Sequence, residues 1–219
     1  MDVDTARTFG RAFVRALRDS NETIELLTAE EISSVGRMDA LLASMRASDE
    51  GRAILAERPR IDSRRVDFGA LKAKPVGTLG RDFADHLERN ALDPDALDVP
   101  VTRGRSEEAN YLLERVRQTH DIWHTLLGLG AAGHEEVLVH AFQWPQLRMP
   151  YSAFVVFFGT FKHLVGERRW RALRTDLRAA FRAGSTAAPL LPVYWEHHWD
   201  ETTESLREQL GVRSADRWC

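Results

Sequence analysis

The fold is decided by residues 120–136, which read HDIWHTLLGLGAAGHEE. Residues 120–127 end a long segment with apolar side chains at helical spacing, and a second such segment begins at His134. Between them lies a glycine-rich corner, Gly128 to Gly133, where a helix ends easily because glycine adopts the left-handed conformation without steric cost. This stretch therefore predicts two consecutive helices that fold back on each other.

The rest of the chain shows the same periodicity. Apolar side chains recur at three- and four-residue steps in the segments that we expect to be helical: residues 5–17, 38–45, 53–55, 81–90, 106–127, 134–144, 151–165, 167–182 and 200–211. Residues 60–80 read as a connector. We expect one helix to stop before Pro145 and Asp200 to cap the last one. The sequence predicts an all-α helical bundle that forms a single domain over residues 1–219.

Composition excludes several classes of protein. Hydrophobic residues make up 43% of the 219 residues and charged residues 29%, which is too apolar for a disordered chain and too charged for a membrane-embedded one. The formal net charge is −3, so no nucleic-acid partner is expected. Cys219 is the only cysteine, which excludes a disulfide framework or a thiolate metal site within one chain. Any metal must therefore be held by His, Asp or Glu.

The start of the chain and its most apolar stretch predict no targeting or spanning segment. Residues 1–4, MDVD, lack the basic start and apolar run of a signal peptide. The most apolar stretch, residues 151–161, is far below the roughly 20 residues that cross a bilayer. We expect a cytoplasmic or peripheral protein.

The pentad His120-Asp121-Ile122-Trp123-His124 is the sharpest chemical feature. On a helix its two histidines and Asp121 share one arc, with the imidazoles one turn apart and their Cβ atoms about 5–6 Å from each other. Glu136 would lie about 18 Å further along a continuous helix, but the glycine corner lets the second helix return it to the first. The group predicts a metal site between two consecutive helices, with zinc foremost and iron, manganese or magnesium as alternatives.

Other interpretations of the pentad stay open at this level. A His beside an acid on a helix face is more often structural or solvated than a metal ligand. Zinc proteases place a Glu directly after the first His, where this chain has the shorter Asp121. Phosphohydrolases with a His-Asp pair need a further His and a distant Asp, for which His86 and Asp176 are available by position alone.

The pentad and its spacing resemble a known family. His120-Asp121-x-x-His124, eleven residues and Glu136 are similar to the signature of the coenzyme Q biosynthesis family whose best-known member is the fourth yeast COQ protein. The family usually has Gly before this glutamate, where this chain has Glu135, so Glu135 and Glu136 could exchange roles. The resemblance covers about residues 45–212 and includes further short motifs: Gly51-Arg52, Arg58-Pro59-Arg60-Ile61, Gly77-Thr78-Leu79-Gly80-Arg81, Trp195-Glu196, Leu206-Arg207 and Leu210-Gly211.

The resemblance implies an all-helical protein that binds a divalent metal through His120, Asp121, His124 and Glu136 and that also binds a long isoprenoid. It implies a function in ubiquinone biosynthesis, as a decarboxylase (a carbon–carbon lyase) that replaces the carboxylate at carbon 1 of a polyprenylated hydroxybenzoate with hydroxyl. The alternative is a non-catalytic scaffold that binds this quinone precursor and organises the other enzymes of the pathway. A homodimer is a further candidate assembly. The expected location is peripheral to the inner membrane, which is the inner mitochondrial membrane in a eukaryote.

Two segments of the second half are candidates for lipid contact. The apolar helix at 151–165 carries Phe154, Phe157, Phe158 and Phe161, which either belong to a central core helix, the favoured interpretation, or line an isoprenoid tunnel. Together with His140 they are the candidate substrate-binding residues. Residues 162–182 hold seven basic and two acidic side chains, an excess of 7 − 2 = +5. A basic amphipathic helix can lie on an anionic membrane, although a solvated face over a buried stripe is commoner. His197 and His198 receive no role.

Overall fold

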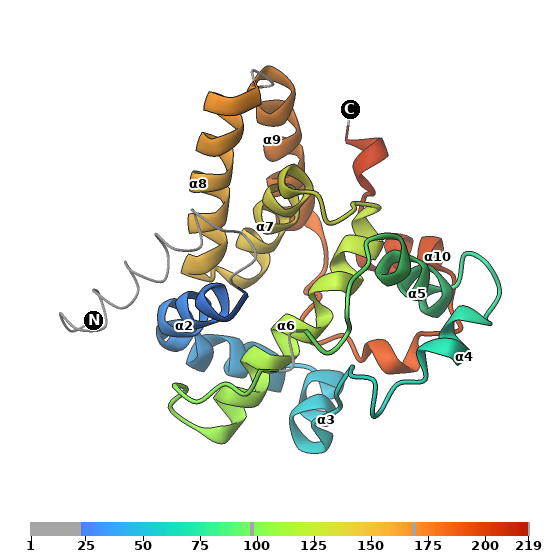
Figure 1. Ribbon diagram of the computed structural model, residues 1–219. Helices are drawn as coiled ribbons and strands as arrows, with labels where there is room; N and C mark the ends of the chain where they lie inside the picture. Colours follow the sequence, from blue (N-terminus) through green and yellow to red (C-terminus); the bar gives the residue numbers. More distant parts are fainter. Residues whose placement is uncertain (1–22, 97–98, 168–169, 219) are drawn as a thin grey trace.

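A computed structural model of the chain describes residues 23–96, 99–167 and 170–218 (Figure 1). Its helices are α2 (Thr23–Arg46), α3 (Asp49–Glu57), α4 (Phe68–Lys72), α5 (Leu79–Arg89), α6 (Glu107–Leu127), α7 (Gly133–Leu147), α8 (Pro150–Glu167), α9 (Trp170–Thr186) and α10 (Thr203–Leu210). Two 3₁₀ turns, η1 (Trp195–His197) and η2 (Ala215–Arg217), flank α10. The all-α prediction is confirmed, because over these ranges no strand forms beyond one isolated bridge between Thr78 and Thr202.

The end of α7 differs from its prediction. The helix passes through Pro145 and ends at Leu147, so the expected stop before the proline is wrong. A proline in the last turn costs one backbone hydrogen bond, and the almost complete burial of Leu147 offsets that loss. The predicted helix over residues 5–17 lies outside the described residues.

Two other boundaries are set by caps that periodicity did not identify. Helix α10 is capped by Thr202, whose hydroxyl accepts a hydrogen bond from the Ser205 N–H, whereas Asp200 forms an ion pair with Lys74. The predicted connector at 60–80 contains α4, which begins where the Asp67 carboxylate accepts the Ala70 N–H. Asp and Thr cap helices because their side chains satisfy a free N–H of the first turn.

Helix α6 runs through the middle of the bundle and is buried on most of its surface (Figure 1). Two of its arginines are almost fully buried, and each is paired with an acid from another element. Arg115 binds both carboxylate oxygens of Glu196 in η1, at 2.6 and 2.7 Å, and Arg117 binds Glu30 of α2 at 2.7 Å. Because a buried arginine without its partner is strongly destabilising, these pairs fix α2 and η1 against α6.

Helices α7, α8 and α9 pack side by side, with α7 in closest contact with α9 (Figure 1). Two glycines allow this close approach. A Cβ atom at Gly184 of α9 would lie 2.1 Å from the Phe142 carbonyl oxygen, and one at Gly159 of α8 would lie 2.3 Å from Val137 Cγ2. The backbone of α9 therefore lies directly against that of α7, the helix that carries Glu136.

Helix α8 lies at the edge of the bundle, so the favoured prediction of a central core helix is wrong (Figure 1). It packs on α2 and α7 with one side, which leaves Phe154 and Phe158 half-buried and Phe157 68% exposed. The side chain of Phe161 is outside the described residues. In the described part of the chain, no helix is both long enough and apolar enough to span a membrane.

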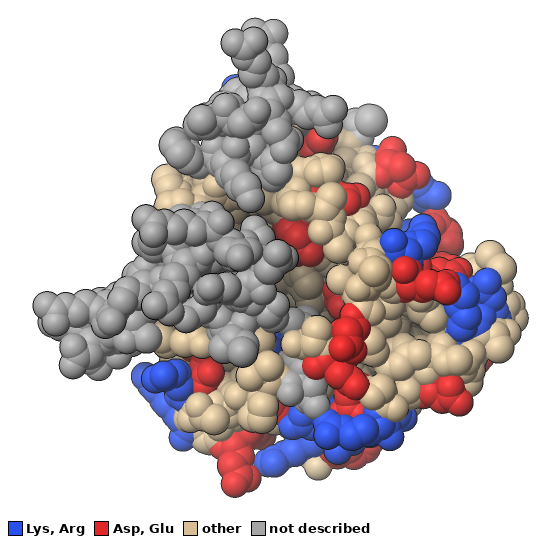
Figure 2. Space-filling model, viewed as in Figure 1, with Lys and Arg blue, Asp and Glu red and all other residues tan. Residues whose placement is uncertain are grey.

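Acidic and basic side chains are interspersed over the described surface in Figure 2. This distribution agrees with a formal net charge of only −3. Many of these charges are paired across elements, as in Lys72 with Asp85 and Glu88, or Arg105 with Asp39. Such exposed pairs contribute little to stability, so packing around α6 is the main source of it.

The close approach of α7 and α9 gives a test of the fold. We expect Gly184→Ala to lower the free energy of unfolding by about 1–3 kcal/mol, because the new methyl group meets a backbone carbonyl that cannot move aside. Gly36→Ala is the matched control, since a Cβ at this exposed position of α2 has no atom within 4 Å. It should raise stability by about 0.5–1 kcal/mol through helix propensity. Urea unfolding of both variants measures the difference, and equal effects would contradict the packing.

Candidate metal centre

The bend between α6 and α7 begins with a left-handed glycine. Gly128 has φ 68°, and its N–H bonds the carbonyls at the end of α6 while Leu129 N–H bonds the His124 carbonyl at 3.0 Å. A residue with a side chain is strained at such a φ value, which explains glycine at this position. Arg207 of α10 donates to the Leu126 carbonyl at 2.7 Å, so the last turn of α6 is also held from outside.

Glu135 fixes the rest of the bend. Its two carboxylate oxygens accept the N–H groups of Gly130 at 2.8 Å and Ala132 at 3.2 Å. Asn90, the residue that follows α5, accepts the Ala131 N–H at 3.1 Å. Glu135 is thus the capping residue of α7, and the next residue, Glu136, is turned toward α6. The ambiguity between the two glutamates is resolved in favour of Glu136 as the candidate ligand.

The same bend orients His124. The His124 Nδ1–H donates to the Gly130 carbonyl at 2.8 Å, so the Nε2 lone pair is free to bind a cation. His124 is fully buried on α6, and its Nε2 lies 3.1 Å from His120 Nε2. Metal-binding histidines commonly donate their second N–H to a carbonyl, because that bond fixes the tautomer and the direction of the ring.

Three ligand atoms converge between the two helices. Glu136 Oε2 lies 3.3 Å from His120 Nε2, and Glu136 Oε1 lies 3.3 Å from His124 Nε2. One ligand atom from each of His120, His124 and Glu136 lies within 4.8 Å of the other two, so the group could hold one divalent cation. Two imidazoles and one carboxylate suit zinc and also iron.

Asp121 is not part of this converging group. Its side chain lines the same cavity as His120 and Glu136 and is half-buried. Burial raises the pKa of Asp121, and the neighbouring histidines offset part of that rise. The structure thus brings together three of the four ligands that the resemblance implies and leaves Asp121 as a carboxylate beside them.

The charges of the cluster depend on one proton, which lies between His120 and Glu136. Burial alone lowers the pKa of His120, but the hydrogen bond and negative charge of Glu136 raise it to about 9. Burial raises the pKa of Glu136, and the hydrogen bond and positive charge of His120 help to hold it well below its ordinary value. A carboxylate and an imidazolium therefore face each other at neutral pH. A divalent cation bound at the cluster takes the place of that proton.

Two further histidines surround the ligands as neutral rings. The His140 ring centroid lies 5.3 Å from that of His120, and the His86 ring centroid lies 5.4 Å from that of His124. Burial, followed by the positive charge of His120, lowers the pKa of His140 to about 3. Burial lowers the pKa of His86 to about 4. Both rings therefore remain uncharged and keep the surroundings of the cluster weakly polar.

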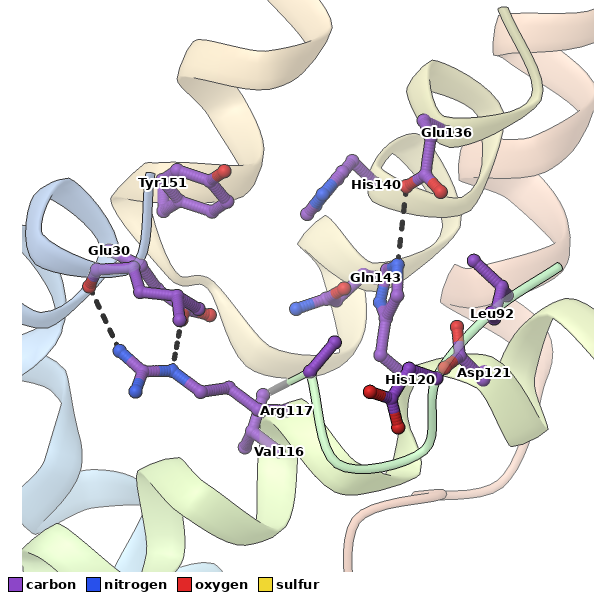
Figure 3. A pocket seen from close by; sticks show the side chains of 13 residues that line it. Glu30, Leu92, Val116, Arg117, His120, Asp121, Glu136, His140, Gln143 and Tyr151 are labelled. Carbon is purple, nitrogen blue, oxygen red and sulfur yellow. Dashed lines mark hydrogen bonds and ion pairs between the residues drawn. The ribbon is translucent and has the colours of Figure 1, made fainter. Parts of the chain in front are cut away.

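A cavity of about 290 Å³ leads away from the cluster (Figure 3). His120, Asp121 and Glu136 line one end, and the Glu30–Arg117 ion pair lies at the other. His140 and Gln143 of α7 line the space between them. The remaining wall is largely apolar and includes Leu27, Leu92 and Val116. The cavity therefore places a cation site at the end of a pocket whose walls suit a flat, apolar ring.

Of the other candidate residues, some lie at the cavity and others do not. His140 lines the cavity, whereas Phe154, Phe157 and Phe158 are not among the described residues that do. His86, considered only by position for a phosphohydrolase, lies against His124, but the cavity lining does not include Asp176.

Sequence analysis missed Glu30, Arg117 and Tyr151 as cavity residues. Arg117 was recognisable, because it lies one turn before His120 and Asp121 on the same helix. Glu30 and Tyr151 come from other helices, and no local pattern distinguishes them.

Comparison with known proteins agrees with this geometry. The family model described as "Coenzyme Q (ubiquinone) biosynthesis protein Coq4" matches residues 4–216. The mitochondrial ubiquinone biosynthesis protein COQ4 homolog of Aedes aegypti is 33% identical over 91% of this chain and 72% of its own length. The Homo sapiens homolog, also named mitochondrial, is 34% identical over 80% of this chain and 65% of its own length.

A solved structure has the same fold. The crystal structure of a Nostoc punctiforme protein assigned to ubiquinone biosynthesis superposes with a TM-score of 0.75 and 25% sequence identity, covering 95% of this chain and 99% of that one. The fold and site define a class of all-helical proteins with a His-His-Glu group between two consecutive helices. The chain belongs to the Coq4 family of ubiquinone biosynthesis proteins.

The geometry of the cluster predicts which glutamate holds the cation. We expect the purified protein to retain about one divalent ion per chain, because one ligand atom from each of three residues converges within 4.8 Å. His124→Ala and Glu136→Gln should each reduce the affinity at least about 100-fold by removing a ligand. Glu135→Gln is the matched control: it should keep the ion and lose about 0.5–1.5 kcal/mol of stability with one capping hydrogen bond. Elemental analysis after dialysis measures the ion, and retention by Glu136→Gln would rule out the site.

Proposed function

We propose that the chain catalyses the decarboxylation step of ubiquinone biosynthesis, at carbon 1 of a polyprenylated hydroxybenzoate. The observation that carries the proposal is the convergence of His120, His124 and Glu136 at the end of a cavity with apolar walls. Replacement of a ring carboxylate by hydroxyl releases carbon dioxide and removes two electrons from the ring. The reaction therefore requires an external two-electron oxidant. With dioxygen as that oxidant and one water as co-reactant the balance closes: the aromatic acid, dioxygen and water give the phenol, carbon dioxide and hydrogen peroxide.

The residues of the chain would each serve that reaction in a defined way. His120, His124 and Glu136 would hold a divalent cation, which as a Lewis acid binds and polarises the carboxylate. Asp121 lies beside this end of the cavity with a raised pKa and is placed to hold or accept a proton. A ring bound against the apolar walls would displace water from them and so strengthen the electrostatic interactions around it.

A non-catalytic scaffold is the competing proposal. The cavity would then bind the prenylated precursor without changing it, and the ligand cluster would have a structural role. The two proposals differ in one measurable respect, which is whether the carboxyl carbon leaves as carbon dioxide in a manner that depends on Glu136.

Carbon release tests the decarboxylase. A host that lacks its own member of the family is supplied with carboxyl-labelled 4-hydroxybenzoate and expresses this chain. We expect labelled carbon dioxide and ubiquinone to be restored by the wild type and by Glu135→Gln, because both keep the ligand cluster. Glu136→Gln should instead accumulate a carboxylated prenyl-ring precursor, detected by mass spectrometry. Normal release of carbon dioxide by Glu136→Gln would favour the scaffold.

We also propose that α9 helps to place the protein on an anionic membrane surface. Its described face carries a shallow groove lined by Leu177, Arg178, Phe181 and Arg182, with Phe181 43% exposed. Exposed aromatic side chains next to arginines are typical of helices that lie at a lipid interface. Residues 162–172, which complete the basic segment of the sequence, have side chains outside the described residues.

Vesicle binding tests this surface. The double variant Arg178→Gln, Arg182→Gln should bind vesicles containing phosphatidylserine more than about tenfold more weakly, because each arginine contributes about 1 kcal/mol near an anionic surface. Val76→Ser is the control, since Val76 is 83% exposed but lies before α5, away from α9. Co-sedimentation measures binding. Equal binding of all three proteins would contradict the proposed contact.

A further inference from the structure

Gln143 is a buried amide with an unsatisfied oxygen. Its side chain is 2% exposed, and its Oε1 atom has no hydrogen-bond partner in the part of the chain that the structure describes. A buried amide oxygen without a partner is costly, and folded proteins retain few of them. The same side chain lines the cavity that ends at the ligand cluster. If the amide rotates so that its oxygen faces the cavity, a group that enters the cavity can supply the missing hydrogen bond.

The position of Gln143 relates it to the cation end of the cavity. Gln143 follows Glu136 by two turns of α7, which is about 10.5 Å along the helix axis. Figure 3 shows the amide between the His120–Glu136 pair and the Arg117–Glu30 pair. The terminal torsion of a glutamine is soft, so the amide can present either its oxygen or its nitrogen to a ligand. A hydroxyl group satisfies both orientations because it donates and accepts.

The charges at the far end restrict the class of ligand. Arg117 is already bound by the Glu30 carboxylate at 2.7 Å and the Leu27 carbonyl at 2.9 Å. Its charge is therefore neutralised and does not attract a second anionic group into the cavity. Burial raises the pKa of Tyr151, so its ring remains a neutral phenol beside His140. A cation held at the ligand cluster would thus face neutral or neutralised polar groups across the cavity, whose lining also includes the exposed carboxylate of Asp93.

We propose that Gln143 determines specificity by hydrogen-bonding a neutral hydroxyl on the ring of the ligand, opposite the carboxylate. The inference rests on the proposed function, because it takes the carboxylate to lie at the cation. Gln143 lies two turns of α7 beyond Glu136 and lines the same cavity, so a ring whose carboxylate lies at the ligand cluster directs its opposite substituent toward the amide. The inference therefore concerns the hydroxyl opposite the carboxylate in the ligand of the proposed function.

Two small aromatic acids test the proposal. The zinc-loaded full-length chain is titrated in a calorimeter with 4-hydroxybenzoate and with 4-methylbenzoate, which has the same shape but cannot hydrogen-bond through its methyl group. We expect the hydroxy acid to bind at least about tenfold more tightly, because the methyl group leaves the buried amide unpaired. In Gln143→Leu the preference should disappear or reverse. Val116→Ala is the matched control: it alters the apolar wall and should keep the preference.

Each outcome decides the role of Gln143. Equal binding of the two acids to the wild type, failure of both to bind, or an unchanged preference in Gln143→Leu would overturn it. Because the readout is binding, it is separate from turnover. A chain that shows the Gln143-dependent preference but releases no carbon dioxide supports this inference and contradicts the proposed function. Release of carbon dioxide without the preference does the reverse.

Discussion

The site depends on the hydrogen bond from His124 Nδ1–H to the carbonyl of Gly130. This bond fixes the tautomer of a fully buried imidazole and turns its Nε2 toward His120 and Glu136. It forms only because the chain reverses immediately after α6, so that the bend passes over the face of the helix it has just left. The chain reversal after α6 therefore also orients the His124 ring.

Buried ion pairs hold the neighbouring elements, η1 and α2, against α6. Arg115 ties η1 to α6, and Arg117 ties α2 to the same helix one turn before the ligands. In a bundle of helices, apolar packing alone permits sliding and rotation, whereas a bidentate pair such as Arg115–Glu196 permits one geometry. The Arg117–Glu30 pair has a second effect, because it closes one end of the cavity with neutralised charge.

The sequence predicted the parts of the structure that depend on local pattern. Helical periodicity and the glycine corner were sufficient to place His120, His124 and Glu136 together. Angular spacing on an ideal helix also included Asp121, which the structure leaves beside the group, because a difference of one residue turns a side chain by about 100°. Glu30 and Tyr151 reach the cavity through long-range packing, and the position of α8 depends on which faces α2 and α7 leave open. Neither follows from local pattern.

The cap formed by Glu135 has a consequence for how such bends can vary. Its carboxylate accepts hydrogen bonds from two N–H groups of the bend, those of Gly130 and Ala132, and so sets the rotation of α7 about its own axis. The direction of the Glu136 side chain is therefore set by these two hydrogen bonds and not by the number of residues in the connection. A bend of another length that keeps these two hydrogen bonds would point the next carboxylate in the same direction. A bend of the same length without them would leave the helix free to rotate about its axis.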